Sequence, residues 1–257
     1  SFALPLMFSS VFAMFALWTD TILLGALSPN SSDVAFYNMA FYFAALIRTF
    51  SLMLPQSLLL PVMMKKFSQN DHSGIGRVYS GLSRFSFLIA VPIGAFLIVY
   101  AKELLVFAFG VEYGRGSYVL SILSVVFITT AFFGHASTVL TAYGKTKWLL
   151  ITSITVFVIN VVGNLLLIPL YGIEGAAIAT GISEIVLAIM MTIKVKKEFR
   201  KGMRFIASLM TLVFIVFVFF GLKKVIGVGL GGLLVSCLLG TITYLILIWN
   251  SGVINNQ

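Results

Sequence analysis

The chain has 257 residues, of which 60% are hydrophobic and 10% are charged, and its mean hydropathy is +1.09. A soluble domain carries about 25% charged residues, so this composition excludes a water-soluble globular fold. The net charge of +9 would suggest a nucleic acid partner in a soluble protein, but most of these basic residues lie in short loops between apolar stretches. We therefore expect the lipid bilayer, and no nucleic acid, as the partner.

About eight long apolar stretches fill most of the chain. A bilayer core is about 30 Å thick and is crossed by about 20 helical residues, whose backbone groups must be hydrogen-bonded within the helix. The predicted fold is therefore an all-α integral membrane helix bundle with about eight transmembrane helices. The predicted spans are residues 2–27, 34–63, 78–100, 117–142, 148–169, 175–193, 205–221 and 226–249.

Turn residues and small residues predict local features of these spans. Pro55 and Pro61 should bend the end of the second span. Pro169 should end the fifth span, and Gly172 should allow a tight turn. The small residues 175–177 should let the sixth span pack closely on its neighbour. Residues 103–109 are too short to cross the bilayer, and we expect them to lie along its outer interface.

Basic residues in the loops predict the orientation of the bundle. One set of loops holds Lys65, Lys66, Arg77, Lys145, Lys147, Lys194, Lys196, Lys197, Arg200, Lys201 and Arg204. The opposite set holds Lys102, Arg115, Lys223 and Lys224. Positive charge accumulates on the cytoplasmic side, so the first set and both ends of the chain are predicted to be cytoplasmic. Lys223 and Lys224 do not fit this pattern.

The chain begins with Ser1 and enters its first apolar stretch at once, without the features of a signal peptide. We therefore expect it to be a fragment that starts at a membrane helix.

A series of short strings resembles a known family in order and spacing. These are WTDTILLG (18–25), VAFYNMA (34–40), LLVFAFGVEY (104–113), LTAYGKTK (140–147), the Asn160 to Asn164 segment and IPLYGIEGAAIAT (168–180). Together they resemble the carboxyl-terminal half of the polysaccharide transporter family, the Wzx-type O-antigen and exopolysaccharide flippases. Their superfamily, MOP, also holds the MATE drug exporters and the lipid II flippases.

The resemblance implies an organisation and a function. Residues 1–200 would form the carboxyl-terminal six-helix lobe of a two-lobed flippase, and residues 201–257 would form two trailing transmembrane helices. The amino-terminal lobe of the same protein would be the missing partner. The protein would move a lipid-linked oligosaccharide, a polyprenyl-pyrophosphate glycan, across the cytoplasmic membrane for polysaccharide biosynthesis. No enzymatic activity, cofactor or metal is expected.

Ionisable residues within the spans are the main candidates for a site, because a charge at the bilayer centre costs about 2.5–3.5 kcal/mol on insertion scales. Arg48 lies deep in the second span, where a guanidinium could bind the pyrophosphate of the substrate with paired donors. An internal ion pair is the alternative. Asp20 is a possible partner for Arg48, although the two residues should differ in depth by about 10 Å. It could otherwise bind substrate hydroxyls or a coupling cation, be protonated, or simply join helices.

Further polar residues complete the predicted site. Tyr37, Asn38 and Gln56 could line a sugar path, although packing explains them equally well. Glu184 could bind a coupling proton or be a protonated acid packed on another helix. Asn160 and Asn164 are four residues apart and share one helix face, where hydrogen bonding between helices is the commoner role.

Other functions remain open at this stage. A cation-coupled, MATE-like exporter of small molecules should have an acidic cavity. The ionisable residues within the spans here are instead mixed, with Arg48 beside the two acids Asp20 and Glu184. A membrane-embedded glycan enzyme would need a reactive group of residues on a sizeable loop, and we expect no catalytic residue. His135 has no second ligand at a metal-binding spacing, so a packed, hydrogen-bonded histidine is expected.

Overall fold

The computed structural model describes residues 3–69, 71–199, 205–226 and 230–250, and every regular element within these ranges is helical. In chain order the elements are α1 (Ala3–Leu27), α2 (Ser32–Ser68), α3 (His72–Val99), α4 (Ala101–Phe109), the 3-10 helix η1 (Val111–Gly116), α5 (Ser117–Phe133), α6 (Ala136–Ala142), α7 (Thr146–Phe199), α8 (Phe205–Ile226) and α9 (Leu230–Asn250). The predicted all-α membrane fold is confirmed.

Four helical stretches among the described residues are long and apolar enough to cross a membrane. They are Ala3–Leu27, Gly74–Val99, Val111–Ala142 and Thr146–Val195. The last of these contains both the fifth and the sixth predicted spans. The chain is therefore a multi-pass membrane protein.

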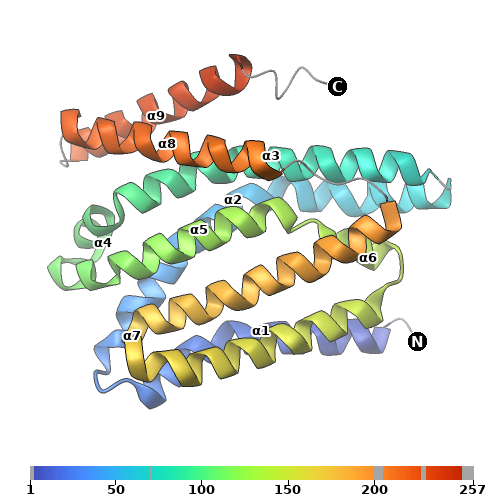
Figure 1. Ribbon diagram of the computed structural model, residues 1–257, viewed down its shortest axis with the longest axis horizontal. Coiled ribbons are helices and arrows are strands. Elements are labelled where there is room, and N and C mark those ends of the chain that lie inside the picture. Colours follow the sequence, from blue (N-terminus) through green and yellow to red (C-terminus); the bar gives the residue numbers. More distant parts are fainter. Residues whose placement is uncertain (1–2, 70, 200–204, 227–229, 251–257) are drawn as a thin grey trace.

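The long helices run side by side, with their connections at two opposite ends of the bundle (Figure 1). α1 packs mainly on α7, and α2, α3 and α5 pack on one another. The α2–α3 and α6–α7 connections lie at the end of the bundle where α1 begins. The α1–α2 connection and the middle of α7 lie at the other end. This separation is the one that the loop charges predict.

α7 consists of two antiparallel limbs joined at Gly172. This glycine has φ 58° and ψ −131°, a conformation that side-chain-bearing residues rarely adopt. The prediction that Pro169 ends the fifth span is wrong, because helix continues past it to Tyr171. Its ring lies near the end of the first limb, so the helix can pass it before the chain reverses at Gly172.

Small residues bring the limbs of α7 together, as predicted. A Cβ atom added to Gly175 would lie 2.2 Å from the carbonyl oxygen of Leu167, and one added to Gly163 would lie 3.0 Å from the Cβ atom of Ala179. Ala176 and Ala177 are fully buried. Close backbone approach is the usual basis of helix association in membranes, where the hydrophobic effect between helices is weak.

The fourth predicted span is interrupted by a turn at Gly134 and His135, which separates α5 from α6. A Cβ atom on Gly134 would lie 2.9 Å from Cδ1 of Leu52, so α2 packs tightly against this turn. His135 is fully buried, and its Nε2 lies 2.8 Å from Oγ of Ser86. The expectation of a packed, hydrogen-bonded histidine is confirmed.

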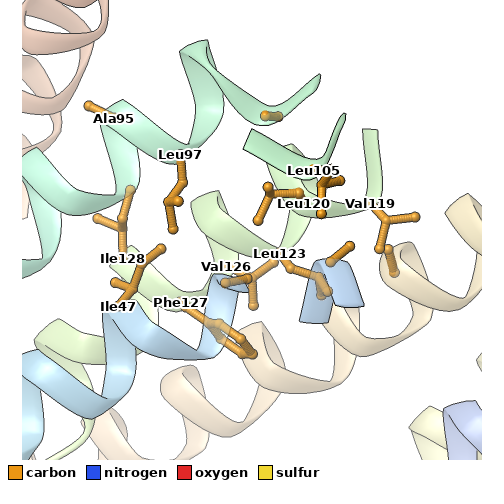
Figure 2. Close-up of a cluster of buried hydrophobic side chains, with 14 of the residues drawn as sticks. Ile47, Ala95, Leu97, Leu105, Val119, Leu120, Leu123, Val126, Phe127 and Ile128 are labelled. Carbon is orange, nitrogen blue, oxygen red and sulfur yellow. The ribbon is translucent and has the colours of Figure 1, made fainter. Parts of the chain in front are cut away.

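A buried apolar core joins α2, α3, α4 and α5 (Figure 2). Ile47 of α2, Leu97 of α3 and Leu105 of α4 meet Leu123 and Phe127 of α5 there. α4 lies at the end of α3 as the short helix that was predicted for residues 103–109. Phe127 of this core also lines the cavity of the candidate site.

α8 packs against α3, and α9 packs against α8. Lys223 of α8 pairs with Glu103 of α4 at 2.7 Å and donates to the carbonyl oxygen of Val99 at 2.8 Å. This pairing explains why one lysine lies on the side that is otherwise poor in positive charge, since its charge is compensated within the protein.

Candidate functional site

A cavity of about 670 Å³ opens between α1, α2, α5, α6 and α7. Its described lining combines apolar side chains with charged and polar ones. The charged and polar side chains are Asp20, Arg48, Thr49, Thr130, Ser137, Ser153, Asn160, Thr180, Ser183 and Glu184. A cavity of this size, with a few convergent polar groups, is typical of a ligand site.

Arg48 provides a positive charge on the cavity wall. Its residue is half-buried, and its guanidinium carbon lies 5.5 Å from the ring centroid of Phe127. Phe127 is 1% exposed and belongs to the core shown in Figure 2. The guanidinium therefore stacks on a fixed ring through a cation–π contact, with its N–H groups available to the cavity.

Asp20 lies at the cavity with only 3% of its surface exposed and accepts hydrogen bonds from four neutral side chains. Oδ2 accepts from the hydroxyls of Tyr37 and Thr180, each at 2.5 Å. Oδ1 accepts from the amide nitrogens of Asn160 at 3.1 Å and Asn164 at 2.7 Å. We call Asp20 and these four residues the Asp20 cluster.

The Asp20 cluster connects four helical segments. Asp20 comes from α1, Tyr37 from α2, Asn160 and Asn164 from the first limb of α7, and Thr180 from the second limb. The predicted shared face of Asn160 and Asn164 is confirmed, since both donate to one carboxylate oxygen. Their own amide oxygens are buried and have no hydrogen-bond partner in the described part of the chain.

The hydrogen bonds of Asp20 come from neutral groups, so Arg48 does not serve as its direct partner. Arg48 instead contacts Phe127. The difference in depth already argued against direct pairing. Arg48 and Asp20 thus line the cavity as separate groups.

The remaining predicted residues fall in different places. Glu184 is half-buried and lines the cavity one helical turn after Thr180. Tyr37 is buried in the Asp20 cluster, and Oδ1 of Asn38 accepts from the hydroxyl of Thr21 at 2.9 Å. Neither belongs to the described cavity lining. The side chain of Gln56 lies outside the described residues.

Sequence reasoning missed Thr180 and Ser183. Both line the cavity, and Thr180 donates to Asp20. A signal was available, because Thr180 precedes Glu184 by four residues and so shares its helix face.

Comparison with known proteins gives matches in sequence and in fold. Residues 1–118 match the profile of a family described as "Polysaccharide biosynthesis protein". The chain is 29% identical over 178 residues to a probable low-salt glycan biosynthesis flippase, Agl15, of Haloferax volcanii. This alignment covers 68% of the chain and 37% of that relative.

Two solved transporter structures have a similar fold. The lipid II flippase MurJ, in an inward closed conformation, matches with a TM-score of 0.74 and 18% identity, over 96% of this chain and 52% of MurJ. An outward-facing MATE family transporter of the MOP superfamily matches with a TM-score of 0.63 and 16% identity, over 93% of this chain and 61% of that one. The chain thus spans about half of the flippase structure and about a third of the curated relative. The sequence matches confirm the predicted resemblance of the chain to the polysaccharide transporters. The solved structures show that its helical fold is similar to that of MurJ and of a MATE transporter.

Proposed function

We propose that the protein containing this chain is a flippase that moves a lipid-linked oligosaccharide across the cytoplasmic membrane by alternating access. One observation carries the proposal: Arg48 lines a cavity of about 670 Å³ within a membrane helix bundle. A cation at this depth is expensive in hydrocarbon, so a water-filled cavity and an anionic ligand account for it best. The proposal extends to this chain the flippase role in the names of its relatives.

The cavity chemistry suits the headgroup of such a lipid. A guanidinium offers paired N–H donors to phosphate oxygens, and the stacking of Arg48 on Phe127 orients them in advance. Hydroxyls of Thr49, Ser153 and Ser183 in the cavity lining could pair with sugar hydroxyls. The polyprenyl tail would remain in the lipid beside the bundle.

The chain supplies one lobe of the transporter in this proposal. Residues 1–200 form the carboxyl-terminal six-helix lobe and residues 201–257 the two trailing helices, as the sequence predicts. The described part of α8 and α9 does not line the cavity, which fits a role outside the transport path. The other lobe would close the open side of the cavity, and rocking of one lobe against the other would expose it to each side in turn.

The Asp20 cluster is proposed as the coupling site of this transport cycle. A buried carboxylate with four neutral donors lacks a compensating positive charge, so a proton or a small cation would be attracted to it. The cluster joins α1, α2 and both limbs of α7, and loss or gain of that positive charge would change how tightly these helices are held together. Glu184, one turn further along the cavity, is a second candidate for proton binding.

Cation-coupled export of small molecules is the competing function, and the likeness to the MATE fold is the observation that favours it. The cavity carries Arg48 as well as two acids, whereas a site for cationic substrates is expected to be acidic without a guanidinium. We also propose that the protein is not an enzyme, because its relatives are flippases and transporters.

A flipping assay tests the proposal. The protein, expressed from its complete gene, is reconstituted into liposomes with a fluorescent polyprenyl-pyrophosphate glycan. A quencher is added outside the liposomes, and the fraction of the fluorescence that it can reach is measured over time. Arg48→Ala should reduce the flipping rate at least about tenfold, since a charge-assisted hydrogen bond contributes about 1.5–3 kcal/mol. Arg84→Ala is the matched control, because Arg84 is exposed. Equal rates in wild type and Arg48→Ala would contradict the assignment.

A further inference from the structure

A second pocket, of about 520 Å³, lies between the two ends of the α7 hairpin that face away from Gly172. It is lined by Gly144, Lys145, Thr146, Lys147, Trp148, Ile151 and Lys194. Three of these described lining residues are lysines and none is acidic. We call this the lysine pocket.

The backbone holds Lys145 in a fixed place. Gly144 has φ 67°, and the N–H groups of Gly144 and Lys145 donate to the carbonyl oxygens of Thr141 and Leu140, each at 2.9 Å. This is a glycine-containing cap at the end of α6. The carbonyl oxygen of Lys145 in turn accepts from the N–H of Trp148 at 3.0 Å, at the start of α7.

Lys194 reaches the same pocket from the other limb of α7. Its ammonium lies 5.5 Å from the ring centroid of Trp148. Met191, one turn before Lys194, lines the large cavity. The lysine pocket therefore lies just beyond the large cavity, at the end of the bundle where positive charge is concentrated.

The apolar part of the pocket points to the membrane interface. Trp148 is a residue type that gathers at the boundary between headgroups and acyl chains. Ile151, one turn deeper, is 51% exposed and would contact lipid. A ligand held here would have its anionic part among three ammonium groups and an apolar part alongside Ile151.

We propose that the lysine pocket binds the phosphate of an anionic phospholipid from the leaflet on this side of the membrane. The headgroup would bridge Lys145, which directly precedes α7, Lys147 in the first turn of α7, and Lys194 near the end of its second limb. Such a bridge clamps the hairpin that carries Asn160, Asn164 and Thr180. The inference does not depend on the substrate that the protein transports.

Native mass spectrometry of the detergent-solubilised full-length protein, titrated with phosphatidylglycerol or with phosphatidylcholine, tests this proposal. The wild type should retain phosphatidylglycerol in preference. A cationic residue near an anionic lipid contributes about 1 kcal/mol, which is about a fivefold change in affinity. The triple variant Lys145→Gln/Lys147→Gln/Lys194→Gln should therefore bind phosphatidylglycerol about 100-fold more weakly.

A matched triple variant, Lys65→Gln/Arg77→Gln/Arg84→Gln, removes the same charge from exposed residues of α2 and α3. Its affinity should stay within about twofold of wild type if binding occurs in a discrete pocket. If the first triple variant does not fold, Lys147→Gln alone should weaken binding about fivefold, and replacement of all three lysines by arginine should preserve it.

Three results would overturn the proposal. One is equal retention of the two lipids by the wild type. Another is an equal loss in both triple variants. The third is displacement of the lipid by stoichiometric inorganic phosphate, which would indicate a site for free anions.

Discussion

Asp20 is held within a membrane span by four hydrogen bonds from neutral side chains. Each donor reduces the cost of burying the carboxylate, and Tyr37 and Thr180 approach it at 2.5 Å. A hydrogen bond to a charged group contributes about 1.5–3 kcal/mol. The arrangement stabilises the carboxylate while leaving its charge uncompensated, which suits a site that gains and loses a cation.

Tyr37→Phe should lower the stability of the protein by about 1.5–3 kcal/mol, because it removes a donor to Asp20 and leaves the ring in place. The measurement is the midpoint temperature of unfolding in detergent. Unfolding is detected as the loss of the monodisperse peak in size-exclusion chromatography. Tyr42→Phe is the control, since Tyr42 is 57% exposed and on the same helix. Equal midpoints for the two variants would remove Tyr37 from the Asp20 cluster.

Asp20→Asn should make transport insensitive to an imposed proton or sodium gradient. The substitution retains the size of the side chain and removes the negative charge that attracts a cation. The flipping rate in liposomes is measured with and without each gradient. Ser137→Ala, at another polar residue of the cavity lining, should retain the response of the wild type. A full gradient response in Asp20→Asn would place the coupling site elsewhere.

Individual polar residues could be identified from the sequence because they interrupt apolar spans. Asp20, Arg48 and Glu184 all reach the cavity lining. The hydrogen-bond partners of Asp20 could not be predicted from the sequence, because they lie up to 160 positions away in the chain. Thr180 is also a common residue in membrane helices, so its type alone gave no signal.

At the scale of elements, the limbs of α7 depend on Gly175. The Cβ atom of Gly175→Ala would lie 2.2 Å from a backbone oxygen, so the limbs must separate. We expect a loss of about 1–3 kcal/mol, seen as a lower unfolding midpoint. Gly81→Ala, in a helix with open space around it, should leave the midpoint unchanged or raise it. A Gly175→Ala protein as stable as Gly81→Ala would argue against the close packing.

Lys223 should hold α8 against the end of α3. Lys223→Gln leaves Glu103 partly buried without its cation, and we expect a loss of about 1–3 kcal/mol. Lys224→Gln removes the same charge from an exposed neighbour whose ammonium lies 5.3 Å from the ring of Phe220. Unfolding midpoints of the two variants provide the test, and a larger effect of Lys224→Gln would contradict the assigned contact.

Helix positions followed from hydropathy, whereas their interruptions did not. The chain reverses at Gly172 and not at Pro169. A proline can remain within a helix near its end. The positive φ angle of the reversal is readily adopted by glycine and rarely by other residues. The turn at Gly134 depends on the close approach of Leu52, which is distant in sequence. Tertiary packing of this kind leaves no periodic pattern in the chain.

At the scale of the whole molecule, loop charges and apolar spans predicted the bundle and the two ends to which its connections separate (Figure 1). The resemblance of short strings predicted the transporter fold. Neither could predict the shape of the cavity, because its described walls come from five helices whose relative positions depend on packing. The cavity beside Arg48 is therefore the part of the account that most needs a direct measurement.

Cysteine accessibility next to Arg48 provides that measurement. In a Cys237→Ser background, Thr49→Cys places a thiol on the cavity wall, and Phe50→Cys places one on an exposed apolar residue outside the described lining. A charged, water-soluble maleimide should label Thr49→Cys, and a lipid-pyrophosphate glycan should protect it, while Phe50→Cys should stay unlabelled in lipid. Equal labelling of the two thiols, or no protection by the glycan, would contradict a water-filled cavity that receives an anionic headgroup.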